Sequence, residues 1–208
     1  MKERQSISLE EAKESYLKNM MEVKWRLRCV RNIIYSREAV TGTKRVDFDA
    51  AYLQLRICIE LLMFALAHGH AGMGFELPSR TTRNEYHAKK VKQEIEKVNS
   101  EFFPVPVYLA SSDGSSHHFE RVSHDLFLSK AEIIEMYGKF LGNKMHASRE
   151  VTLPEIDPSE ALKLQEIFSK FLHLVNWHYV KLGEDRLFLF AMNFESEKNV
   201  VLIEASAG

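Results

Sequence analysis

The sequence lacks most of the motifs that mark the common classes of enzyme. It has no GxGxxG, no GxxxxGK followed by Ser or Thr, and no GxSxG, which excludes the usual dinucleotide, P-loop and α/β-hydrolase signatures. Only two cysteines occur among 208 residues, and neither Cys29 nor Cys58 has a cysteine or histidine at metal-ligand spacing. We therefore expect two buried thiols in a reducing cytoplasm.

The chain also lacks an excess of either charge. Its formal net charge is -1, from 28 Lys and Arg against 29 Asp and Glu. This balance gives no global attraction to nucleic acid or to a membrane surface, so a basic site has to be local. The charged start MKERQSISLEEAKESY has no apolar segment of the kind that forms a secretory signal. The length suits one domain with a sizeable core.

One stretch, 51–70, is apolar almost all the way round: AYLQLRICIELLMFALAHGH. A helix of this kind is either a buried central helix or a membrane span. Charges at mid-span cost about 2.5–3.5 kcal/mol each on insertion scales, so Arg56 and Glu60 favour the core helix of a bundle without a membrane. Arg56 and Glu60 are four residues apart and can pair on one helical face.

Start signals predict further helices on both sides of this one. Ser8 and Glu11 form a capping box, in which each side chain bonds to the other residue's backbone amide, and apolar periodicity continues to about residue 36. Asp47 is the expected N-cap of the central helix. Later starts are expected at Thr82 with Glu85, at Ser129 with Glu132, and at Asp157-Pro158 with Glu160. We expect the last helix to end at Gly183.

The remaining segments are expected to be extended or irregular. The run 102–107 should be extended because of its two prolines, and its two phenylalanines should fix it to the bundle. Residues 109–128 are expected to be irregular, and 187–194 with 199–203 to form a β-hairpin. The predicted fold is mainly α: a bundle of about five helices over 1–183, with the hairpin of 184–208 packed on it in a single domain.

Three runs carry a resemblance: LQLRICIELLMFALA, KVNSEFFPVPV and LSKAEIIEMYGKFLGNKMH. Over roughly residues 50–205 the chain resembles a group of uncharacterised bacterial proteins of about this length. That group shares a central Arg-x-x-x-Glu helix, a Phe-Phe-Pro loop and a tyrosine-bearing helix that ends in histidine. The resemblance implies a helical bundle and no established activity.

More loosely, the long antiparallel helices look like HEPN-type bundles. Many HEPN proteins are metal-independent endoribonucleases of toxin–antitoxin and phage-defence systems, with an Arg, four to six further residues and a His presented across a dimer. Here Arg80 and His87 have six residues between them, but the pair spans a helix start. Arg83 and His87 are one residue too close.

Two groups of residues are candidates for a site. Arg56 can hold a phosphate or carboxylate beside Glu60, with His146 as a proton carrier, and Arg80 with His87 is the alternative catalytic pair. The competing interpretation is a structural Arg56–Glu60 pair that fixes the neighbouring loop. Lys24, Arg28 and Arg31 form a basic stripe that can bind RNA phosphates, although a solvated helix face explains it equally.

Other histidines do not predict a metal site. His117, His118, His124 and Asp125 share a serine-rich segment, which lacks the rigidity that three or four zinc ligands need. We expect no metal and no cofactor.

Two classes of function follow from these features. The first is a non-catalytic interaction module, a homodimer or a protein with a partner, which uses the hairpin edge or the first helix in a toxin–antitoxin or phage-defence setting. The alternative is a metal-independent endoribonuclease that uses Arg and His on the bundle.

Overall fold

The computed structural model describes residues 7–78, 87–114, 116–141, 157–182 and 186–206. The helices in these ranges are α1 (Leu9–Tyr35), α2 (Lys44–Gly72), α4 (Ala88–Val98), α5 (Lys130–Glu135) and α7 (Pro158–Asn176), with a π-helical turn, η1 (Met136–Leu141). The strands are β1 (Val105–Ser112), β2 (His117–Arg121), β3 (Trp177–Lys181), β4 (Arg186–Ala191) and β5 (Val201–Ser206).

The fold is α+β, and the prediction of a mainly α bundle with a terminal hairpin is wrong. All five strands form one antiparallel sheet in the order β2-β1-β3-β4-β5. The predicted hairpin exists as β4 and β5, but it is two strands of this larger sheet. β3 pairs with β4 across the expected 183/184 boundary, so the two parts that we expected share one sheet.

Two sequence segments account for the missed strands. Residues 109–128, expected to be irregular, contain most of the β1–β2 hairpin, whose residues are largely exposed and carry little apolar alternation. The last predicted helix is too long: α7 ends at Asn176, and the chain continues directly as β3. His178 and Leu182 fit the helical period by coincidence, because both are buried in the sheet layer instead.

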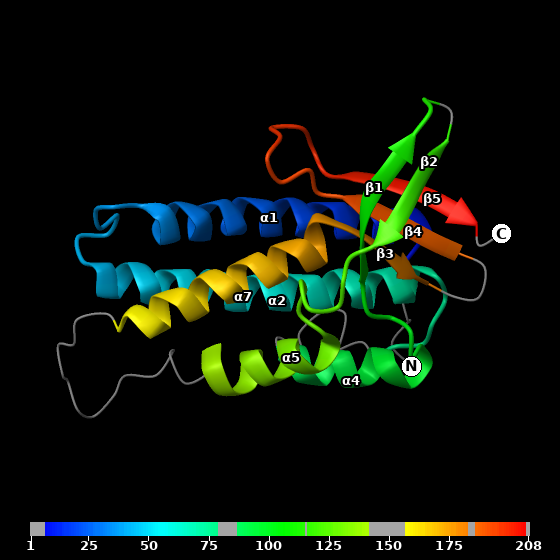
Figure 1. The fold of residues 1–208 in the computed structure, drawn as a ribbon. Helices are drawn as coiled ribbons and strands as arrows, with labels where there is room; N and C mark the ends of the chain where they lie inside the picture. Colours follow the sequence, from blue (N-terminus) through cyan, green and yellow to red (C-terminus); the bar gives the residue numbers. More distant parts are fainter. Residues whose placement is uncertain (1–6, 79–86, 115, 142–156, 183–185, 207–208) are drawn as a thin grey trace.

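The helical layer is built on α1 and α2, which lie antiparallel as expected (Figure 1). The capping boxes of Ser8 with Glu11 and of Ser129 with Glu132 are confirmed. Asp157 is confirmed as the N-cap of α7, and Phe102 is fully buried as expected. The start at Thr82 lies outside the described residues.

Two expectations about single residues are wrong. Thr43 and not Asp47 is the N-cap of α2, and the buried Asp47 carboxylate instead accepts hydrogen bonds from the backbone of Val40 and Thr41. Cys58 is buried, but Cys29 is exposed on α1.

α2 is the central helix of the core. It is the one helix in the described parts of the chain that is long and apolar enough to cross a membrane. Its apolar residues are nevertheless buried against α1, α4 and η1, from Phe48 to Leu66. The inner face of the sheet completes the core: Tyr16 of α1 stacks on Phe190 of β4, with ring centroids 3.8 Å apart.

Candidate functional site

Arg56, Glu60 and Tyr137 form a polar cluster between α2 and η1, in which each side chain contacts the other two. The Nε of Arg56 lies 3.4 Å from Oε1 of Glu60. The Tyr137 hydroxyl donates to the same Oε1 at 2.6 Å and accepts from Nη2 of Arg56 at 3.2 Å. The guanidinium carbon also lies 4.5 Å from the centroid of the Tyr137 ring, within the range of a cation–π contact.

The cluster lies at the edge of the core and reaches solvent. The side chains of Arg56 and Glu60 are 26% and 20% exposed, whereas Tyr137 is buried. The i, i+4 spacing on α2 sets the two charges on one face, as expected. Tyr137 comes from η1, and single π-helical turns of this kind occur often at functional sites.

His87 extends the cluster. It is the N-cap residue of α4, where its side chain makes no capping hydrogen bond. Its ring instead meets the Tyr137 ring edge to face, with centroids 5.5 Å apart at an angle of 72°. The imidazole of His87 therefore lies against the same tyrosine that contacts Arg56 and Glu60.

The Tyr137 hydroxyl is a proton donor in this environment. Burial raises the pKa of Tyr137 to about 12, and the hydrogen bond to the Glu60 carboxylate acts in the same direction. The Arg56 charge and the backbone N–H of Ala88 oppose this rise. At neutral pH the phenol is therefore protonated and directs its hydrogen towards Glu60.

The guanidinium retains the capacity to bind a further group. It has five N–H donors in a planar fork that matches carboxylate and phosphate oxygens. The contacts with Glu60 and Tyr137 occupy only part of that fork. The Arg56 side chain is 26% exposed, so its remaining N–H donors are the groups that an anionic ligand would contact.

The other predicted catalytic residues divide into two groups. His146 and Arg80 lie outside the described residues, so the expected Arg56–His146 and Arg80–His87 pairs are not placed. His87 contacts Tyr137, which in turn contacts Arg56 and Glu60. One residue of the alternative Arg80–His87 pair therefore lies beside the Arg56–Glu60 pair. The sequence assigned Tyr137 no role in the site, because a tyrosine on a helix carries no signal of its hydroxyl's partners.

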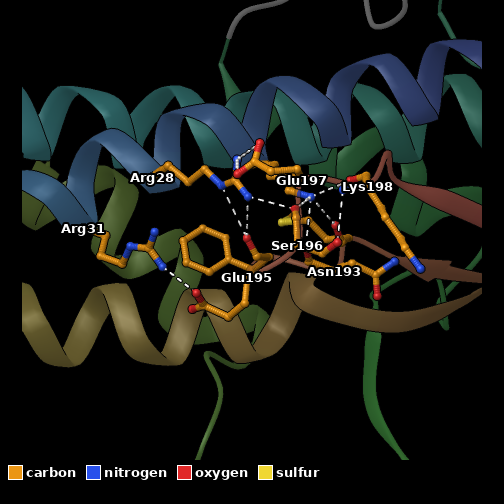
Figure 2. A network of polar contacts seen from close by, with 10 residues as sticks. Arg28, Arg31, Asn193, Glu195, Ser196, Glu197 and Lys198 are labelled. Carbon is orange, nitrogen blue, oxygen red and sulfur yellow. Dashed lines mark hydrogen bonds and ion pairs between the residues drawn. The ribbon is translucent and has the colours of Figure 1, made fainter.

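The predicted basic stripe on α1 has partners within the chain (Figure 2). Lys24, expected on a solvated face, is only 2% exposed. Its ammonium nitrogen lies within hydrogen-bond distance, 2.7–3.0 Å, of four backbone carbonyl oxygens of the β4–β5 connection: Met192, Asn193, Ser196 and Lys198. Burial lowers the pKa of Lys24, and the neighbouring charge of Arg28 lowers it further.

Arg28 and Arg31 hold the same connection from its outer side. Arg28 donates to the carbonyls of Phe194 and Ser196 and pairs with Glu197. Arg31 pairs with Glu195 at 2.8 Å. The prediction of an exposed basic stripe is wrong for Lys24, which is buried. Arg28 and Arg31 already bond to carbonyl and carboxylate groups of the same chain. We therefore treat the three cations, with the connection 192–200, as a structural clamp.

No group of three or more His, Cys, Asp or Glu side chains in the described ranges is arranged to hold a metal ion. His117 and His118 are consecutive in β2, so their side chains point to opposite faces of that strand. A further histidine contact, between Ser15 Oγ and His68 Nδ1 at 2.5 Å, links α1 to α2.

Comparisons with models of protein families, with curated proteins and with solved structures each find no match. The cluster of Arg56, Glu60, Tyr137 and His87 is therefore interpreted from its own geometry.

Proposed function

We propose that the protein is a metal-independent endoribonuclease whose active site contains Arg56, Glu60, Tyr137 and His87. The observation that carries the proposal is the Tyr137 hydroxyl, held between a carboxylate and a guanidinium that both reach solvent. This arrangement combines a phosphate-binding fork, a neutral hydroxyl donor and two groups able to exchange protons. A toxin–antitoxin or phage-defence setting in the cytoplasm is part of the proposal.

The reaction follows from the roles of these groups. Glu60 accepts the proton of a ribose 2′-hydroxyl, whose oxygen attacks the adjacent phosphorus. Arg56 stabilises the charge that develops on the phosphate oxygens. Once Glu60 has taken the proton, the Tyr137 hydroxyl turns from that carboxyl group and donates to the same phosphate oxygens. The bond from phosphorus to the 5′-oxygen breaks, and His87 supplies the proton to that oxygen. The products are a 2′,3′-cyclic phosphate and a 5′-hydroxyl end.

The test is cleavage of single-stranded RNA by the full chain in EDTA. We expect Tyr137→Phe, which removes only the hydroxyl, to lower kcat/KM about 100-fold, since loss of one transition-state donor costs roughly 10²–10³. The matched control is Tyr35→Phe, because Tyr35 is exposed at the end of α1.

Arg56→Gln has a control on the same helix. Arg45 pairs with Asp49 at the same i, i+4 spacing, near the start of α2 and outside the cluster of Arg56, Glu60 and Tyr137. We expect Arg56→Gln to abolish cleavage and Arg45→Gln to leave it unchanged. Absence of cleavage by the unmodified chain, or equal effects of the two substitutions, would contradict the proposal.

The second candidate is the non-catalytic interaction module. It is favoured by β5, where Val201 and Ile203 are exposed at the end of the sheet. If the chain binds a partner and cleaves no RNA, this candidate replaces the first.

A further inference from the structure

β5 presents an edge that the rest of the described chain does not pair. It is the last strand in the order β2-β1-β3-β4-β5, so β4 pairs with one side of it only. Unpaired edges are usually blocked by lysine, proline or a bulge. The strand Val201–Ser206, VLIEAS, has no lysine or proline, and its register with β4 is regular throughout.

The side chains of β5 divide between the two faces of the sheet. Leu202 packs against the core, and Glu204 forms an ion pair with Lys13 of α1. Val201 and Ile203 lie on the opposite face, where they are 44% and 42% exposed. The edge therefore combines free backbone groups with an apolar pair on its outer face.

On the neighbouring strand, two residues of β4 lie beside this exposed pair. Ile203 is opposite Leu189, and Val201 is opposite Ala191. Both of these β4 residues are buried, so the exposed apolar surface on this part of the sheet begins at β5. A ligand that covers it has to satisfy a backbone edge and bury two aliphatic side chains, which is what another β-strand does.

We propose that β5 pairs antiparallel with β5 of a second copy of this chain, about a two-fold axis at Leu202. This register sets Val201 opposite the partner's Ile203, and Ile203 opposite the partner's Val201. Such cross-strand aliphatic pairs stabilise an antiparallel sheet. A two-fold axis makes the contact self-complementary, so it closes as a dimer with a continuous sheet.

The charges on β5 permit this contact. Glu204 is the only charged residue of the strand, and Lys13 already neutralises it. In the proposed register Glu204 is opposite the partner's Val200, so like charges do not face each other across the axis. Replacing an aliphatic residue of the edge by lysine would introduce that repulsion, since one lysine from each copy would meet near the axis.

The inference is independent of the endoribonuclease proposal and specifies the partner of the interaction module. Its test is the mass of the protein in solution, whereas the endoribonuclease proposal is tested by RNA cleavage. One proposal can therefore fail while the other holds. A single strand pair gives an interface at the small end of the range for specific complexes. We therefore expect a reversible dimer in sedimentation velocity, with twice the chain mass of 24.1 kDa at high concentration.

Ile203→Lys should convert the dimer to a monomer at all concentrations tested. The matched control is Leu162→Lys, because Leu162 is 67% exposed on α7, away from the sheet edge. Thermal melting checks that both variants fold. A monomeric unmodified chain, or an Ile203→Lys variant that still dimerises, would overturn the proposal.

The register is tested by disulfide formation in a Cys29→Ser background, which removes the exposed native thiol. Opposed residues of an antiparallel pair have Cα atoms about 4.5–5.5 Å apart, within the range of a disulfide. A mixture of Val201→Cys and Ile203→Cys chains should cross-link on oxidation, and neither variant alone should do so. Equal cross-linking of single variants would exclude this register.

Discussion

At the scale of single residues, the structure shows which groups surround the charged side chains that lie on the two long helices. Lys24 and Arg56 both occur on helices with strong apolar faces, but their surroundings differ. Four carbonyls enclose Lys24, whereas Arg56 keeps part of its donor fork open beside Glu60 and Tyr137. The first residue is therefore structural, and the second belongs to the proposed site.

Lys24→Met should destabilise the fold by about 3 kcal/mol, because it removes the charged donor that contacts four carbonyls of the β4–β5 connection. The side-chain volume is nearly retained, so the loss reports the hydrogen bonds rather than a cavity. Urea unfolding measures the change. Lys18→Met is the control, since Lys18 is an exposed residue of the same helix in an i, i+4 pair with Glu14. Equal stability of the two variants would show that the clamp contributes nothing.

At the scale of elements, a close approach between α1 and α2 depends on a glycine. A Cβ added to Gly72 would lie 2.3 Å from Cβ of Ala12 and 3.1 Å from the carbonyl oxygen of Ser8. Neither atom can move without shifting α1. Gly72 thus allows the end of α2 to pack directly on the first turn of α1.

Gly72→Ala should therefore lower the free energy of unfolding by about 1–3 kcal/mol, the usual cost of overpacking. Gly138→Ala in η1 is the matched control, because a Cβ there has no atom within 4 Å. It should be neutral or slightly stabilising, as alanine is the better helix residue. Thermal unfolding compares the two, and a neutral Gly72→Ala would contradict the packing argument.

At the scale of the whole molecule, two buried histidines join the helical layer to the sheet. His178 of β3 donates to the Val175 carbonyl and accepts from the Tyr16 hydroxyl of α1. His70 of α2 donates to the Leu66 carbonyl and accepts from Asn99, whose amide also donates to the carbonyl of Lys181. Burial lowers the pKa of both imidazoles to about 4.

These lowered pKa values predict acid sensitivity between about pH 6.5 and pH 4. Above 6.5 both imidazoles are neutral in the folded and unfolded chain, so their contribution to stability is complete. As the pH falls, the unfolded chain binds protons first and stability is lost until the folded pKa near 4 is reached. At pH 5 the loss is about 2 kcal/mol for each imidazole.

Urea unfolding at pH 7.5 and pH 5 measures this loss. His70→Gln keeps a polar side chain at the position but cannot titrate, so its stability should depend less on pH. A variant with the same pH dependence as the unmodified chain would show that His70 does not contribute.

The sequence by itself determined most of the helix starts and the pairing of the last two strands, because caps and β-branched runs are local signals. Arg56 and Glu60 were identified as a pair for the same reason, since four-residue spacing on a helix is local.

Only the tertiary structure decided the five-stranded sheet, the burial of Lys24, and the meeting of Tyr137 and His87 with Arg56. β3 pairs with β1 and β4, and Lys24 meets carbonyls more than 160 residues away along the chain. Such contacts depend on which segments pack together, and the residue types at one position do not contain that information.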